Sequence, residues 1–93
     1  MTAIYSRNPD VVFRKIADEF ILVPIRQKVV DLKSVFTMNE AAAFIWEHID
    51  GKRNIAQIKD EIAETFEVEA SQAQADVSEI VSQLEALSLI RKA

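Results

Sequence analysis

The chain contains no cysteine and only one histidine among its 93 residues. Without thiols it cannot form disulfides, thiolate zinc sites, iron–sulfur ligation or a cysteine nucleophile. A metal site would need further histidines or a carboxylate cluster of suitable geometry beside the single imidazole. We therefore expect no resident metal and no other cofactor.

Glycine and proline are also scarce, with one Gly and two Pro. A single glycine excludes a glycine-rich phosphate-binding loop. Apolar residues make up 49% of the chain, which is typical of a compact globule and argues against disorder. At this length we expect one domain spanning residues 1–93.

Long hydrophobic runs are missing as well. The longest run extends from Phe20 to Ile25, far short of the roughly 20 residues that a membrane helix needs. The N-terminal stretch lacks the basic and then apolar order of a signal peptide. We expect a soluble, cytoplasmic protein that does not enter a membrane.

No residue pattern points to catalysis. Nucleophilic catalysis needs a nucleophile beside a base. The only histidine, His48, falls in the last turn of an expected helix, where a cation complements the helix dipole. Asp60, Glu61 and Glu64 share another expected helix without a histidine, so we interpret them as a solvated acidic face. The chain is therefore not expected to be an enzyme.

The character of the sequence changes near residue 39. Before it, β-branched and aromatic residues predict short strands at 11–16, 19–25, 28–32 and 34–38. The stretch 28–38 is compatible with one bent strand or with two. Pro24 lacks a backbone N–H, so we expect it to end its strand or to lie on an edge.

After residue 39 the apolar spacing becomes helical. It predicts three helices, over residues 40–49, 55–66 and 70–88. Trp46 lies in the apolar stripe of the first helix, where a core position is the expected role.

The helix ends carry recognisable signals at several positions. Asn39 and Asn54 are good N-cap residues for the first two helices. Gly51 can adopt the left-handed conformation that follows a helix C-terminus. Glu69 and Ser71 remain alternative caps for the third helix.

This order of elements predicts an α+β fold, an N-terminal three-stranded β-sheet followed by three α-helices in a winged helix–turn–helix shape. Many such shapes bind DNA. Here the third helix has three carboxylates and no Lys or Arg, and the net charge is −4. Phosphate backbones would be repelled, so we expect no nucleic-acid binding.

A sheet edge offers a different function, because an exposed edge can accept an extended peptide as an added strand. Along residues 34–38, Val35 and Thr37 share one face. Ser34, Phe36 and Met38 share the other, and this larger, more apolar set is expected to face the core. From these residues alone, a covered strand and a peptide-receptive edge are both open.

A longer ordered pattern resembles a known protein family. It comprises a strand, an Asn cap, small residues, an apolar-Trp-Glu triplet, Asp-Gly, and an Ile-rich acidic helix. Here these are Met38-Asn39, Ala41-Ala42-Ala43, Ile45-Trp46-Glu47, Asp50-Gly51 and residues 55–62, with Leu84 and Leu87-Ser88-Leu89-Ile90 farther on. The set is similar to the PqqD-like proteins, peptide chaperones of pyrroloquinoline quinone biosynthesis, and their relatives, the RiPP recognition elements. The chain departs from the family pattern at Glu69-Ala70, often Asp-Pro, and at Ser88, often Gly.

The resemblance implies a winged helix–turn–helix domain that does not bind DNA. Such domains capture the leader segment of a ribosomally made precursor peptide, which adds as a strand beside the third strand and lies toward the third helix. They present it to a modifying enzyme, often a radical S-adenosylmethionine enzyme.

On this basis we expect Ser34 to Met38 to bind the leader through their backbone. Asp76, Ile80 and Gln83 are expected to form the wall of the groove. The alternative function is a non-catalytic protein-interaction or regulatory subunit without a peptide ligand. The sequence does not predict the oligomeric state.

Overall fold

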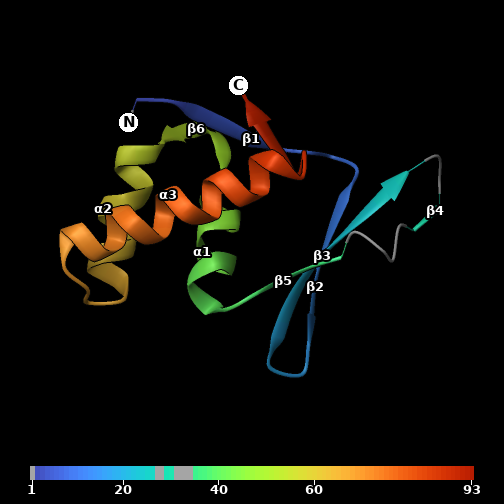
Figure 1. The fold of residues 1–93 in the computed structure, drawn as a ribbon, viewed down its shortest axis with the longest axis horizontal. Coiled ribbons are helices and arrows are strands. Elements are labelled where there is room, and N and C mark those ends of the chain that lie inside the picture. Colours follow the sequence, from blue (N-terminus) through green and yellow to red (C-terminus); the bar gives the residue numbers. More distant parts are fainter. Residues whose placement is uncertain (1, 27–28, 31–34) are drawn as a thin grey trace.

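The structure is a computed structural model that describes residues 2–26, 29–30 and 35–93. This part of the chain forms seven strands and three helices: β1 (Ile4–Arg7), β2 (Val11–Ile16), β3 (Glu19–Arg26), β4 (Val29–Val30), β5 (Phe36–Met38), α1 (Glu40–His48), β6 (Asp50–Asn54), α2 (Ile55–Thr65), α3 (Ala70–Ala86) and β7 (Ile90–Lys92). Figure 1 shows the three helices packed together, with the β2–β3 hairpin extending away from them. The predicted α+β order, an N-terminal sheet followed by three helices, is confirmed, but that sheet has four strands, β2, β3, β4 and β5, where three were predicted.

The N-terminal sheet is antiparallel and is organised around β3. β2 pairs along one edge of β3, from Val11 opposite Pro24 to Ile16 opposite Glu19. β5 pairs along the other edge, and β4 pairs with the end of β3. The predicted strands 11–16 and 19–25 are thus confirmed. Of the predicted strand 34–38, residue 34 lies outside the described residues, and the strand runs from Phe36 to Met38. Of the predicted strand 28–32, the structure describes only Val29–Val30, and residues 28, 31 and 32 lie outside the described residues.

The expectation for Pro24 was wrong. β3 continues past it to Arg26, and Pro24 is buried in the central strand of the sheet. It lies opposite Val11, the first residue of β2, and the next residue along, Ile25, donates its N–H to the carbonyl of Asp10 at 2.7 Å. Pro24 lies where the hydrogen-bonded pairing of β3 with β2 ends. The absence of its N–H therefore costs few of the hydrogen bonds between these strands.

A second antiparallel sheet was missed by the sequence patterns. β1 lies at its centre, between β6 and β7. Tyr5 lies opposite Lys92, and Ile4 lies opposite Asn54. This sheet joins the N-terminal strand, the segment between α1 and α2, and the C-terminal strand, as Figure 1 shows.

The helices begin where the caps predict. Asn39 accepts a hydrogen bond from the Ala42 N–H at 2.9 Å, and Asn54 forms a capping box with Gln57. α3 begins at Ala70 with Glu69 as its N-cap residue, although the Glu69 side chain makes no capping hydrogen bond. The three helices end one or two residues earlier than predicted.

The core lies between the helices and the two sheets. Trp46 is 3% exposed, which confirms its predicted core position, and the Arg7 guanidinium lies 5.9 Å from its ring. The largest fully buried side chains are Leu22, Ile45, Ile49, Ile58, Ile62, Leu84, Leu89, Ile90 and Val77. Within the described ranges, no helix combines the length and hydrophobicity needed to cross a bilayer.

Candidate functional site

β5 is an edge strand in the part of the chain that the structure describes, where it pairs with β3 and with no other strand. In an antiparallel pair, successive residues alternately direct their backbone N–H and C=O toward the partner strand and away from it. The outer side of β5 therefore presents backbone groups that no described strand pairs. Such an edge can accept an added strand.

The side chains of β5 face the directions that their alternation predicts. Met38 is 4% exposed, and Phe36 is partly buried and packs against the core. Thr37 is exposed, and Val35, which precedes the strand, is partly buried. Ser34 lies outside the described residues, so its contribution stays a prediction.

A hollow of about 190 Å³ lies between the start of α1 and the middle of α3. Its lining consists of Asn39, Ala41, Ala42, Ile45, Asp76, Glu79 and Ile80. Asn39 directly follows Met38, so the hollow adjoins the end of β5. The structure thus places two of the three predicted wall residues, Asp76 and Ile80, around one depression next to the strand edge.

The third predicted wall residue, Gln83, is exposed on α3 and is not among the residues that line the hollow. Its amide Nε2 lies 3.5 Å from Glu79 Oε1. Glu79 itself lines the hollow and was not predicted. Its spacing of three residues from Asp76, which makes the two carboxylates neighbours on the helix surface, is the signal that could have found it.

The wall on α3 is anionic and the floor on α1 is apolar. Gln72 Nε2 donates to Asp76 Oδ1 at 2.8 Å, which orients that carboxylate. Among the described residues, neither Asp76 nor Glu79 has an ion-pair partner. Ala42 and Ile45, at the floor, are buried. The groups gathered here suit non-covalent recognition of a ligand.

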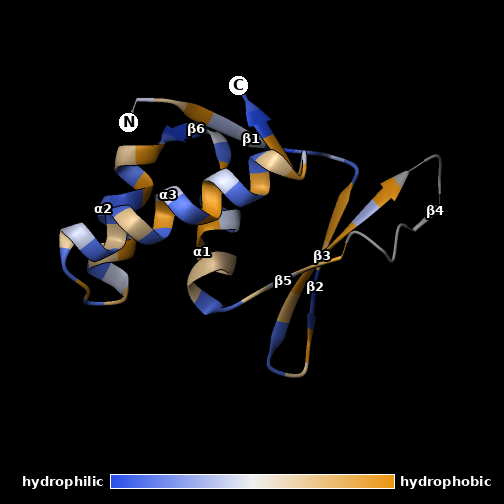
Figure 2. Ribbon diagram, viewed as in Figure 1, coloured by the Kyte–Doolittle hydropathy of each residue, from blue (hydrophilic) through white to orange (hydrophobic). Residues whose placement is uncertain are grey.

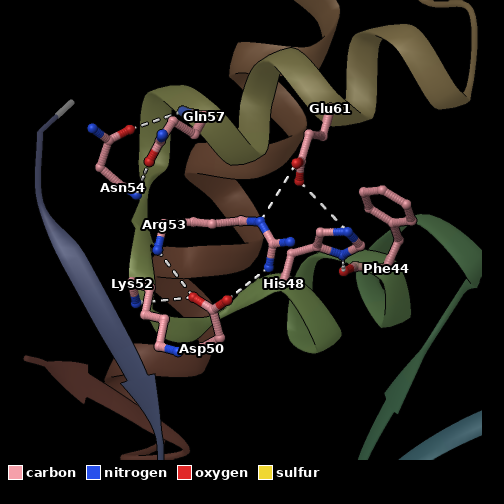
Figure 3. A network of polar contacts seen from close by, with 8 residues as sticks. All are labelled: Phe44, His48, Asp50, Lys52, Arg53, Asn54, Gln57 and Glu61. Atoms are coloured by element: carbon pink, nitrogen blue, oxygen red, sulfur yellow. Dashed lines mark hydrogen bonds and ion pairs between the residues drawn. The ribbon is translucent and has the colours of Figure 1, made fainter.

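A polar network fixes the other end of α1 (Figure 3). His48 Nδ1 donates to the Phe44 carbonyl at 2.8 Å, and its Nε2 lies 3.5 Å from Glu61 Oε2 on α2. Arg53 also joins the network, with its Nε 3.4 Å from Glu61 Oε1. The only histidine therefore connects two helices, which agrees with its predicted structural role.

Asp50 organises the turn that follows α1. Its Oδ1 accepts hydrogen bonds from the backbone N–H groups of Arg53 and Lys52, and its Oδ2 lies 2.7 Å from the Arg53 guanidinium. The Arg53 N–H, followed by the Lys52 N–H, lowers the pKa of Asp50 below its ordinary value of 3.8. The described residues contain no group of three or more histidines and carboxylates placed to hold a metal ion.

Comparison with known proteins adds three findings. The family model described as "Coenzyme PQQ synthesis protein D (PqqD)" matches residues 19–90. Proteins named "PqqA binding protein" from Xanthomonas oryzae pv. oryzae and Xanthomonas euvesicatoria pv. vesicatoria are 35% identical over 57 residues. Those matches cover 61% of this chain and 62% of each relative, so the chain spans less than two thirds of the relatives' length.

The third finding is a likeness to a solved structure, that of TbiB1 in complex with the TbiA(beta) leader peptide. The TM-score is 0.72, with 92% of this chain and 94% of that chain covered. Because only 19% of the residues are identical, the likeness establishes the shared fold.

Proposed function

The chain belongs to the PqqD family, and we propose that it is a non-catalytic peptide chaperone that binds the leader segment of a ribosomally made precursor peptide. The observation that carries this proposal is the outer edge of β5, which no described strand pairs, beside the hollow between α1 and α3. Two relationships support it. The matching relatives are named for binding PqqA, and the structure of like fold holds a leader peptide.

The leader would bind by adding a strand to β5. Backbone groups of residues 34–38 would supply hydrogen bonds, which give affinity with little dependence on peptide sequence. Asp76, Glu79 and Ile80 would contact the side chains that point into the hollow, and these contacts would give selectivity. Gln83 would lie at the far end of this wall, where it would hold Glu79 in place.

The family resemblance further suggests a domain shape, a cellular location and a partner enzyme for this chain. The three helices with the β2–β3 hairpin as a wing would form a winged helix–turn–helix, in which the wing does not approach DNA. Residues 1–93 would act as one cytoplasmic domain. The domain would present the bound peptide to a modifying enzyme, for which a radical S-adenosylmethionine enzyme is the class we expect.

The test is a binding titration with synthetic peptides encoded by short reading frames beside the gene. A fluorescently labelled leader should bind saturably with moderate affinity, because an extended peptide loses conformational entropy when it becomes ordered. If none of these peptides binds while the chain associates with a folded partner protein, the chain is an interaction subunit without a peptide ligand.

Two substitutions in the wall should weaken this binding. Ile80→Ala removes apolar contact from the hollow, and Asp76→Lys replaces one of the two negative charges of its wall with a positive charge. Each should lower leader affinity about tenfold, equivalent to about 1.4 kcal/mol. Glu85→Lys is the matched control, since it makes the same charge change at an exposed position of α3 outside the hollow. An equal loss of affinity in Asp76→Lys and Glu85→Lys would show that the added positive charge weakens binding wherever it lies on α3. The hollow would then not be the binding groove.

A further inference from the structure

The N-terminal sheet is apolar on both faces. Phe13, Leu22 and Phe36 share the inner face, which packs against the core. The register places a second set on the outer face, where Val12 lies opposite Val23, Arg14 opposite Ile21, Ile16 opposite Glu19, and Thr37 beside Ile21. We call Val12, Arg14, Ile16, Glu19, Ile21 and Val23 the outer face.

The apolar members of the outer face lie outside the core. Ile16 is 59% exposed, and Val12, Ile21 and Val23 are only partly buried. None of these four belongs to the core cluster or to the partly buried residues packed against it. Figures 1 and 2 show the hairpin that carries them extending away from the helices, and in Figure 2 its two strands contain both hydrophobic and hydrophilic segments.

An antiparallel sheet with one solvated face usually alternates apolar and polar side chains, so that the outward set is polar. The outer face breaks this rule with four aliphatic side chains on two paired strands. Exposed apolar side chains gathered on one face can mark an interaction site, and Ile16 is the most exposed of these four. We therefore expect another apolar protein surface to cover these four side chains.

The charges on the outer face indicate what covers it. Arg14 and Glu19 are both exposed, have opposite signs, and lie near the hairpin turn. Among the described residues, neither has an ion-pair partner, and Arg14 Nη1 donates only to the carbonyl of Phe13. A surface of one cation, one anion and aliphatic side chains is complementary to itself. A partner of one charge sign would leave either Arg14 or Glu19 facing a like charge.

We propose that a second copy of this chain covers the outer face, sheet against sheet about a two-fold axis, with Arg14 of each copy meeting Glu19 of the other. A two-fold interface requires a patch that is complementary to itself. Two sheets packed face to face lie about 10 Å apart with interdigitated side chains, a spacing that aliphatic residues fill well. The proposal does not depend on peptide binding, because the outer edge of β5 and the hollow under α3 are separate surfaces.

The first test is analytical ultracentrifugation of the whole chain over concentrations from micromolar to millimolar. The unmodified chain should form dimers reversibly, and Ile16→Lys or Val23→Lys should raise the dimer Kd at least tenfold. Ser78→Lys is the control, because it adds the same charge at an exposed position of α3. Circular dichroism checks folding, and if Val23→Lys unfolds, the exposed Ile16 position still carries the test. A chain that stays monomeric at millimolar concentration, or equal effects of Ile16→Lys and Ser78→Lys, would overturn the proposal.

The second test exchanges the two charges. Arg14→Glu and Glu19→Arg should each raise the dimer Kd several-fold, because each places like charges opposite one another. The double variant, Arg14→Glu with Glu19→Arg, should return the Kd to within about twofold of the original, since exposed ion pairs contribute modestly but depend on sign. A double variant that dimerises no better than the single variants would show that these side chains do not meet across the interface.

Discussion

Three residues other than glycine adopt a left-handed backbone in the described part of the chain. Their φ values are +54° at Ala17, +53° at Glu67 and +60° at Ser88. A side chain in this conformation is disfavoured by roughly 1 kcal/mol, because Cβ approaches the following carbonyl oxygen. Ser88 is also the position at which the family pattern often has glycine. The backbone strain at this residue therefore falls where the chain departs from the family pattern.

Replacing Ser88 should therefore stabilise the fold. Ser88→Gly removes the Cβ but keeps the carbonyl that accepts a hydrogen bond from Asn8 Nδ2 at 3.0 Å. We expect the free energy of unfolding, measured in urea, to rise by about 0.5 to 1 kcal/mol. The same substitution at the exposed helical Ser78 should instead destabilise by about 0.5 kcal/mol or more, because glycine is disfavoured inside a helix. A loss of stability in Ser88→Gly would contradict the assigned strain.

Asp50 should make stability depend on pH in the acid range. Its pKa in the folded state lies below 3.8 because the backbone N–H groups of Arg53 and Lys52 bind its ionised form. A depressed folded pKa contributes stability above the unfolded pKa, and this contribution is lost as pH falls through the folded pKa. The unmodified chain should therefore exceed Asp50→Asn in stability at pH 6 by more than at pH 3. Urea unfolding at the two pH values checks this. If the two chains differed in free energy of unfolding by the same amount at both pH values, the ionisation of Asp50 would not be coupled to folding.

Elements with a strong local residue pattern could be predicted from the sequence. β2 and β3 are rich in β-branched and aromatic residues, and the three helices follow apolar stripes with Asn39 and Asn54 as caps. Strands β1, β6 and β7 could not be predicted, because they are short and β6 consists of Asp-Gly-Lys-Arg-Asn. Their strand conformation comes from pairing between distant parts of the chain, which no local pattern encodes.

The candidate site was predictable to a similar extent. Alternation along residues 35–38 was enough to orient Phe36, Thr37 and Met38, and helical spacing was enough to group Asp76 with Ile80. The contribution of Ala41 and Ala42 could not be foreseen, since alanines in a helix carry no chemical signal. Only the packing of α1 against α3 places them in the lining of a hollow.

The edge of β5 can be tested as an element. Val35→Pro removes one backbone donor next to the strand and restricts the preceding residue. Leader affinity should fall about tenfold if this edge binds the peptide, a change of about 1.4 kcal/mol. Val35→Ala keeps the N–H and should stay within about twofold. Unchanged affinity in Val35→Pro would show that the leader does not bind along this edge.

At the level of the whole molecule, the two sheets have different tasks. The sheet of β6, β1 and β7 holds the two ends of the described chain together against the helices. The sheet of β2, β3, β4 and β5 extends outward, with an edge at β5 that no described strand pairs and with an apolar outer face. The proposed peptide capture and the proposed self-association would therefore use separate surfaces of the molecule.

We propose that a leader peptide adds to the edge of β5 and contacts α3, and an amide NMR titration of the isotopically labelled chain with the neighbouring short peptides tests this. We expect shifts concentrated at residues 35–38 and 72–84, with slowed hydrogen exchange of the β5 amides that face the peptide. Saturable binding with shifts confined to β1, β6 and β7, or no shift with any of these peptides, would contradict it.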